Sequence, residues 1–314
     1  MGKSTAHSPN IAYIYETIMT RNIHPVINIF LGLLRPFIYA NFWVAGAVWA
    51  LTRLSEFQLT QWWEVGTFNE YGYFLLNPSF AGLNAAGTLI VYGFARLFES
   101  PGDEGTQSKI SQWRSAMPKT AQLSMGLGAS YVAIWWALHG SWNLLFLYAG
   151  AIAVAALYPL PFILRKSGGG LRSIPGLKLV VIAAVWAYVT AVIPSIHAGT
   201  FTVGVFLERF WWTAALTLPF DIRDMMVDQG SIKTVPHIIG SRNSAWLANL
   251  MLWFSFYIQV QFFQMPLAYT FGLYLLCSII IVLANPKLGD LYYSLLIEGL
   301  PFLLLGLWVL SPYL

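Results

Sequence analysis

Cysteine and charged residues are scarce in this sequence. The single cysteine, Cys277, lies within a long apolar run, which excludes an intramolecular disulfide and a cysteine metal cluster and predicts inert packing. The histidines include no pair four residues apart, so the spacing typical of zinc sites is missing. Charged residues make up 10% of the chain, and the bases are spread over short segments. We therefore expect no nucleic-acid-binding surface.

Two kinds of segment are also missing. Residues 1–10 are polar, and no short apolar core with a small-residue cleavage site follows them, so we expect no removed signal peptide. The sequence shows no internal repeat and no duplicated segments broken by glycine and proline, which would be typical of a transporter built from repeats. A transporter is therefore the least favoured function class.

Apolar residues dominate the chain instead. They make up 57% of its 314 residues, and the mean hydropathy is +0.62. This composition is typical of a membrane protein with many spans, so we expect an all-α bundle of about nine transmembrane helices. We expect a single integral membrane domain over residues 1–314. The predicted spans are 28–52, 72–97, 120–138, 142–164, 178–196, 201–221, 244–264, 266–285 and 291–312.

The basic residues predict the orientation in the membrane. With nine spans, nearly all of them fall on the side of the N-terminus, while the opposite loops offer little beyond Arg53. Because bases are enriched in cytoplasmic loops, we expect residues 1–24 in the cytoplasm and the C-terminus outside, in the plasma (inner) membrane if the source is bacterial. The bases on the predicted cytoplasmic side are Lys3, Arg21, Arg96, Lys109, Arg114, Lys119, Arg165, Lys166, Arg172, Lys178, Arg223, Lys233, Arg242 and Lys287.

One predicted outer segment, residues 53–71, differs from the other outer connections. It is longer, and it mixes tryptophan and tyrosine with several glutamates. This mixture is typical of the membrane interface. We therefore expect an interfacial helix or hairpin here.

Three carboxylates stand at the end of the sixth apolar run. Asp221, Asp224 and Asp228 are spaced i, i+3 and i+7, so a continuing helix places them on one face. A charge at the bilayer centre costs roughly 2.5–3.5 kcal/mol, which indicates contact with water or with a cation. One interpretation is a site for a hard divalent cation. The other is a solvated helix end whose acids only pair with neighbouring bases such as Arg223 and Lys233.

The residues that follow carry a resemblance to a known family. Asp221, Asp224 and Asp228, then Lys233-Thr234-Val235-Pro236 and Gly240, resemble the second aspartate-rich motif of the UbiA superfamily of intramembrane prenyltransferases. The nine predicted spans and the place of the motif after the sixth also match that family.

The resemblance implies a helical bundle around a lipid-facing cavity. It implies that Asp221, Asp224 and Asp228 are the catalytic residues that hold Mg²⁺, the cofactor that grips an isoprenyl diphosphate. The prenyl group would pass to a lipid-soluble acceptor such as a quinone precursor. The bases that would bind the diphosphate are Arg96, Lys178, Arg223 and Lys233.

The family's first motif, N-x-x-x-D-x-x-x-D at the end of the second helix, has no recognisable counterpart. One register offers Glu99 and Asp103, with Pro101 expected to break the helix between them. Another register places Arg96 at a motif position. There its guanidinium would be a fixed cation in place of a metal ion and would pair with the diphosphate or with the aspartates. Both interpretations stay open.

A second hallmark of the family is a tyrosine with a lysine four residues later at the end of the fourth helix. Here Tyr158 is followed at that distance by Phe162. Two functions from different classes therefore remain. One is a Mg²⁺-dependent prenyltransferase, and the other is a UbiA-like membrane protein that has lost catalysis and serves as a lipid-binding protein or as a subunit of a membrane complex.

Charges also occur within predicted spans, at Glu208-Arg209 in the sixth and Glu298 in the ninth. Ionisable residues inside a membrane are functional candidates, but structural pairing between helices explains them equally well. At 1.5 Å per residue, Glu208 lies about 20 Å along the helix from Asp221. It therefore belongs either to the far end of a prenyl-binding tunnel or to a helix contact.

Overall fold

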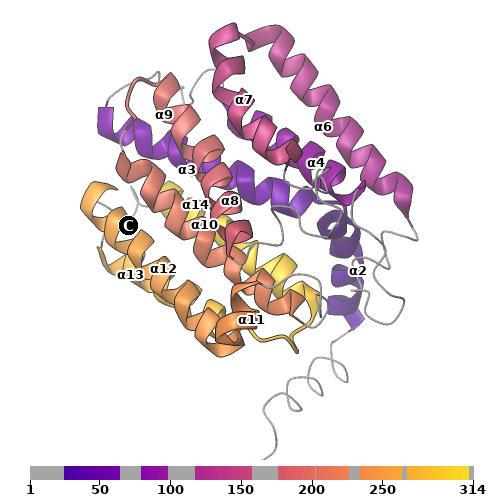
Figure 1. The fold of residues 1–314 in the computed structure, drawn as a ribbon, viewed down its shortest axis with the longest axis vertical. Coiled ribbons are helices and arrows are strands. Elements are labelled where there is room, and N and C mark those ends of the chain that lie inside the picture. Colours follow the sequence, from indigo (N-terminus) through magenta and orange to yellow (C-terminus); the bar gives the residue numbers. More distant parts are fainter. Residues whose placement is uncertain are drawn as a thin grey trace, which may run out of the picture.

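The protein is all-helical wherever its structure is described. The computed structural model describes residues 25–63, 79–97, 117–157, 176–201, 203–225, 234–263 and 267–310, and every regular element in these ranges is a helix (Figure 1). The all-α prediction is confirmed for this part of the chain. The α-helices are α2 (Pro25–Tyr39), α3 (Phe42–Trp63), α4 (Ala81–Leu97), α6 (Pro118–His139), α7 (Trp142–Leu157), α8 (Leu177–Ala187), α9 (Ile193–His197), α10 (Val203–Asp224), α11 (Val235–Ile239), α12 (Ser241–Phe263), α13 (Leu267–Val282) and α14 (Leu300–Leu310), and the π-helical segments are η2 (Tyr188–Val192) and η3 (Tyr292–Ile297).

The first predicted span is wrong in its boundaries. Residues 28–52 do not form one helix, because the chain breaks between α2 and α3 at Asn41, whose φ is +70°. Asparagine is one of the few residues other than glycine that visits this left-handed region. Helix α3 then continues to Trp63, eleven residues beyond the predicted end.

Helices α8, η2 and α9 follow one another without interruption from Leu177 to His197, as the predicted fifth span requires. The π-helical turn at Tyr188–Val192 ends two residues before Pro194, which is the second residue of α9. Proline has no N–H and clashes with the carbonyl four residues earlier, and a π-helical turn is one way for a helix to absorb such a local change. The long helix therefore continues through the proline.

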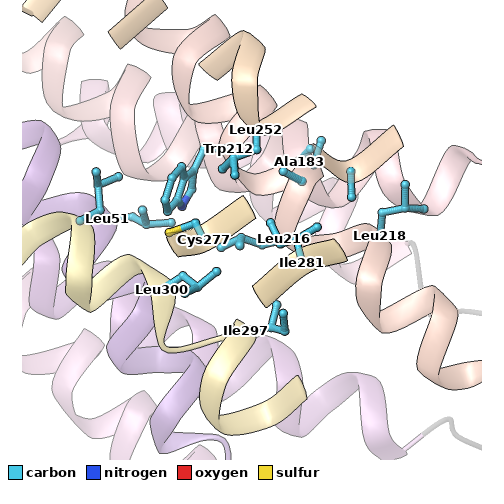
Figure 2. Packing of buried hydrophobic residues seen from close by; sticks show 14 of the residues in the cluster. Leu51, Ala183, Trp212, Leu216, Leu218, Leu252, Cys277, Ile281, Ile297 and Leu300 are labelled. Atoms are coloured by element: carbon cyan, nitrogen blue, oxygen red, sulfur yellow. The ribbon is translucent and has the colours of Figure 1, made fainter. Parts of the chain in front are cut away.

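Helix α10 lies at the centre of the main core and packs against α8, α12, η2 and α13 (Figure 1). Figure 2 shows Trp212 of α10 together with Leu252, Cys277 and Ile281 from the neighbouring helices α12 and α13. All four side chains are fully buried. The burial of Cys277 agrees with its predicted packing role. A smaller apolar cluster joins α4, α6, α7 and α9, and α6 and α7 lie at one edge of the bundle (Figure 1).

Two helices in the described part of the chain, Leu177–His197 and Tyr292–Leu310, are long and apolar enough to cross a membrane by length and composition. Three shorter apolar helices are Ala81–Ala95, Trp142–Ala155 and Leu267–Val282. The described helices overlap the other eight predicted runs, although α4 begins at Ala81, nine residues after the predicted start of the run 72–97. The number of membrane crossings and the orientation stay predictions.

Candidate functional site

The last turn of α10 carries the first two motif aspartates. Asp221 and Asp224 are three residues apart on this helix, so they share a face as predicted. Their surroundings differ, since the Asp221 side chain is 1% exposed and that of Asp224 is 27% exposed. Asp228, the third predicted ligand, lies outside the described residues. Its place in the site stays a prediction.

Lys178 brings a cation to these carboxylates from the first turn of α8. Its Nζ atom donates a hydrogen bond to Asp221 Oδ1 at 2.6 Å and lies 4.0 Å from Asp224 Oδ2. Gly176, two residues before Lys178, is the N-cap of α8. Its φ is +78°, a left-handed conformation that glycine adopts readily. The Lys178 side chain is 19% exposed, so this ion pair lies at the edge of the core. Lys178 was predicted to bind diphosphate, and the structure places it at the aspartates.

Arg223 turns toward the second aspartate. Its Nε atom donates to Asp224 Oδ1 at 2.8 Å, and its guanidinium lies over the rings of Phe220, at 5.1 Å, and Tyr293, at 5.9 Å. Guanidinium groups are attracted to aromatic faces in this distance range. Arg223 therefore fixes Asp224 against the η3 segment. Its predicted contact with diphosphate stays a prediction.

The chain returns to the same end of the bundle through the short helix α11, which packs against α10 and α12. Thr234 stands at its N-cap, and its hydroxyl lies 2.8 Å from Nδ1 of His237. The same nitrogen accepts the Thr234 backbone N–H at 3.3 Å. This cap is a local reason for the Thr-x-x-His spacing after the aspartates. Lys233, the predicted phosphate contact just before it, lies outside the described residues.

The remaining predicted site residues belong to segments around α4. Arg96 lies in the last turn of α4, but its side chain is outside the described part, as are Glu99 and Asp103. Tyr158 also lies outside it. The interpretations of the missing first motif therefore stay open.

The described donors are chemically suited to magnesium. No group of three or more histidine, cysteine, aspartate or glutamate side chains that could hold a metal occurs within the described ranges. Asp221 and Asp224 nevertheless converge on one point, since both have an oxygen within 4.0 Å of Lys178 Nζ. Mg²⁺ is commonly held by one or two carboxylates together with substrate phosphates. These two aspartates fit that pattern if Lys178 moves away.

A second polar cluster lies deep in the bundle, at Glu208 and Arg209. Both residues are completely buried. Arg209 Nη2 donates to Ser55 Oγ and to Gln58 Oε1, each at 3.1 Å, and Glu208 Oε1 accepts from Ser255 Oγ at 3.1 Å. These contacts join α10 to α3 and α12, which supports the interpretation as structural pairing between helices.

The sequence interpretation missed the burial of Arg53 and Glu56. The segment from residue 53 was expected at an interface, but the Arg53–Glu56 ion pair is buried on α3. Glu56 also accepts the backbone N–H of Phe80 at 2.8 Å and the Ser79 hydroxyl at 3.0 Å, which ties the start of α4 to α3. The i, i+3 spacing of opposite charges within apolar surroundings was the available signal. Residues 64–71 of the segment lie outside the described residues, and its position relative to a membrane stays a prediction.

No protein-family model matches the sequence, and no curated protein matches it by sequence. Among solved structures, a UbiA homolog from Archaeoglobus fulgidus bound to GPP and Mg²⁺ is similar over 90% of this chain and 98% of that chain, with TM-score 0.50 and 13% identity. The same homolog bound to DMAPP and Mg²⁺ gives TM-score 0.50 and 14% identity over the same shares. A digeranylgeranylglyceryl phosphate synthase covers 89% of this chain and 96% of that chain at TM-score 0.45 and 12% identity.

Proposed function

We propose that this protein, which has a UbiA-like fold over 90% of its length, is a membrane-embedded prenyltransferase. It transfers an isoprenyl group from a diphosphate donor to a lipid-soluble acceptor and depends on Mg²⁺. The observation that carries the proposal is the convergence of Asp221, Asp224 and Lys178 at the end of the central helix. The similar structures bind GPP and DMAPP with Mg²⁺, which supports a donor of this class.

Each side chain of the cluster then has a definite task. Asp221 and Asp224 hold Mg²⁺ through their carboxylate oxygens, and Asp228 is the proposed third ligand. A Mg²⁺ ion held there would supply positive charge to offset the negative charge that develops on the departing diphosphate. Arg223 positions the Asp224 carboxylate, because its Nε atom donates a hydrogen bond to Asp224 Oδ1.

The remaining bases are proposed to contact the diphosphate oxygens. Lys178 is close enough to reach a ligand at the aspartates, since its ammonium already contacts Asp221. We assign Arg96 and Lys233 to the same anion by the family resemblance. Lysine binds phosphate as a flexible point charge, and arginine binds it through a planar fork.

The membrane setting is part of the proposal. Two described helices are suited to cross a bilayer, and the aspartate end of α10 is proposed to face the cytoplasm by the distribution of bases. In this orientation the water-soluble diphosphate is held at the cytoplasmic end. The prenyl chain and the acceptor then lie among membrane lipids.

The second candidate function is a UbiA-like membrane subunit or lipid-binding protein without catalysis. One observation favours it. Lys178 pairs with Asp221 at 2.6 Å and so takes up an oxygen that the metal requires. In this alternative the ion pair is permanent, and the aspartates serve only to hold α8 against α10.

The test is a transfer reaction with the full-length protein in lipid nanodiscs. The protein is incubated with GPP, Mg²⁺ and a mixture of quinone precursors, and both diphosphate release and prenylated products are measured. We expect Mg²⁺-dependent product formation that Asp221→Asn abolishes. Binding of GPP without any release of diphosphate under these conditions would instead favour the subunit without catalysis.

A further inference from the structure

The position between Asp221 and Asp224 is already taken by a side chain of the protein itself. Lys178 Nζ lies 2.6 Å from Asp221 Oδ1 and 4.0 Å from Asp224 Oδ2. Asp221 is almost completely buried, so this ammonium is the counter-ion that allows a carboxylate to exist there.

A divalent cation and the ammonium cannot both use Asp221 Oδ1, because like charges this close repel strongly in surroundings of low dielectric constant. Mg²⁺ on its own therefore has to displace Lys178. The displaced ammonium loses its 2.6 Å contact with Asp221, and a diphosphate at the aspartates supplies phosphate oxygens within reach of a flexible lysine stem. Lys178 lies in the first turn of α8, where the helix dipole disfavours a cation and favours an anion. This position further favours the binding of a diphosphate near Lys178.

We propose that Lys178 is a resident counter-ion that makes Mg²⁺ binding conditional on the diphosphate. With no donor present, Lys178 occupies the aspartates and metal alone binds weakly. When metal and diphosphate arrive together, Lys178 moves from Asp221 to the phosphate oxygens and releases the carboxylates to the metal. The inference rests on the proposed function, because it assumes that these aspartates are a metal site.

The experiment measures Mg²⁺ affinity calorimetrically on the full-length protein in nanodiscs, with and without inorganic pyrophosphate. In the wild type we expect pyrophosphate to raise the Mg²⁺ affinity of the protein, beyond the binding of Mg²⁺ by pyrophosphate itself, by roughly 5- to 150-fold, the usual range of coupling between two ligands.

Lys178→Met removes the ammonium and keeps most of the stem. We expect this variant to bind Mg²⁺ without pyrophosphate at least about tenfold more tightly than the wild type and to lose most of the coupling. Lys178→Arg keeps the charge and should keep the coupling. Lys119→Met, at an exposed lysine in the first turn of α6, is the matched control and should behave as the wild type.

Thermal unfolding provides a second readout if Lys178→Met is poorly folded without metal. In that variant Mg²⁺ alone should raise the Tm, because it replaces the missing counter-ion of Asp221. The double variant Lys178→Met/Asp221→Asn removes both charges, so it should be more stable than the single variant and its Tm should not respond to Mg²⁺.

The outcomes separate the two proposals. If the wild type binds Mg²⁺ together with pyrophosphate but Lys178→Met gains no affinity for Mg²⁺ alone and no Mg²⁺-dependent rise in Tm, the counter-ion role is overturned and the metal site stands. If neither protein binds Mg²⁺ under any of these conditions, both the counter-ion role and the proposed function are overturned.

Discussion

Helix α10 carries two charged clusters that differ in what surrounds them. Glu208 and Arg209 are completely buried, form an ion pair with 3.5 Å between Arg209 Nε and Glu208 Oε2, and hydrogen-bond to polar side chains of neighbouring helices. Asp221 and Asp224 lie about 20 Å further along the helix, and the lysine and the second aspartate there remain partly exposed. The first arrangement is suited to hold helices together, and the second to exchange a protein cation for a ligand.

The buried cluster is also less well satisfied. Arg209 Nη1 and Gln259 Nε2 have no hydrogen-bond partner within the described part of the chain. A buried N–H without a hydrogen-bond partner lowers the free energy of unfolding by about 1–3 kcal/mol. This layer of polar contacts therefore joins α3, α10 and α12 at a loss of stability. We therefore expect charge removal at the two ends of α10 to have different consequences for the free energy of unfolding.

The largest effect is expected for Arg209→Leu. It leaves the Glu208 carboxylate buried without a charge partner, which costs about 3–5 kcal/mol of unfolding free energy. Equilibrium unfolding in mixed micelles measures this. The double variant Glu208→Met/Arg209→Met should recover most of the loss, because no buried charge remains. A single variant that loses under about 1 kcal/mol would show that Glu208 is not dependent on Arg209.

Asp221→Asn is expected to have the next largest effect on stability. It removes the buried negative charge that pairs with Lys178 and should lower the unfolding free energy by about 1–3 kcal/mol. Asp224→Asn should cost less, about 1 kcal/mol or below, because its ion pairs are partly exposed. The same unfolding assay compares the two. Asp290→Asn is the control, since it removes a carboxylate that acts on Arg223 from the same end of the bundle. Equal losses for Asp221→Asn and Asp224→Asn would contradict the ranking by burial.

Gln259→Leu tests a single hydrogen bond of the buried layer. Gln58 Nε2 donates to Gln259 Oε1 at 3.2 Å and links α3 to α12. Hydrogen bonds between membrane helices contribute about 0.6 kcal/mol on average and up to about 1.7, and Gln259 Nε2 is unpaired within the described part. We therefore expect a loss below about 1 kcal/mol in the unfolding assay. A loss above about 2 kcal/mol would mean that the layer acts as one cooperative network.

The smallest effect is expected for Arg223→Lys. The charge that pairs with Asp224 is kept, and mainly the attraction to the Phe220 and Tyr293 rings changes. Such contacts contribute about 0.5–1 kcal/mol at exposed sites. A double-mutant cycle uses Tyr293→Leu as the second background. In that background Arg223→Lys should lower the unfolding free energy less than it does in the wild type. If Arg223→Lys lowers the unfolding free energy equally in both backgrounds, the contact between Arg223 and the Tyr293 ring does not contribute to stability.

The sequence predicted features that depend on local periodicity. The apolar runs located most helices, and the i, i+3 spacing correctly placed Asp221 and Asp224 on one face of α10. The break at Asn41 was missed, because a single residue in the left-handed region leaves the apolar pattern of residues 28–52 unchanged.

Partners across helices could not be predicted in the same way. Lys178 and Asp221 are 43 residues apart, and their contact depends on the packing of α8 against α10. The buried pair of Arg53 and Glu56 shows the same limit. From the sequence its charges indicate an interfacial segment, and only the contact between Glu56 and the backbone N–H of Phe80, just before α4, reveals that the pair is buried. Sequence patterns give the face of a helix, whereas tertiary packing decides what that face meets.

We propose that the two ends of α10 have different roles, one in ligand binding and one in packing. The direct measurement is the binding of a non-hydrolysable isoprenyl diphosphate analogue to nanodisc-embedded protein, with and without Mg²⁺. We expect Mg²⁺-dependent binding in the wild type and in Glu208→Met/Arg209→Met, and its loss in Asp221→Asn and Asp224→Asn. Binding that survives both aspartate substitutions, or that is lost only when the buried pair is replaced, would contradict the account.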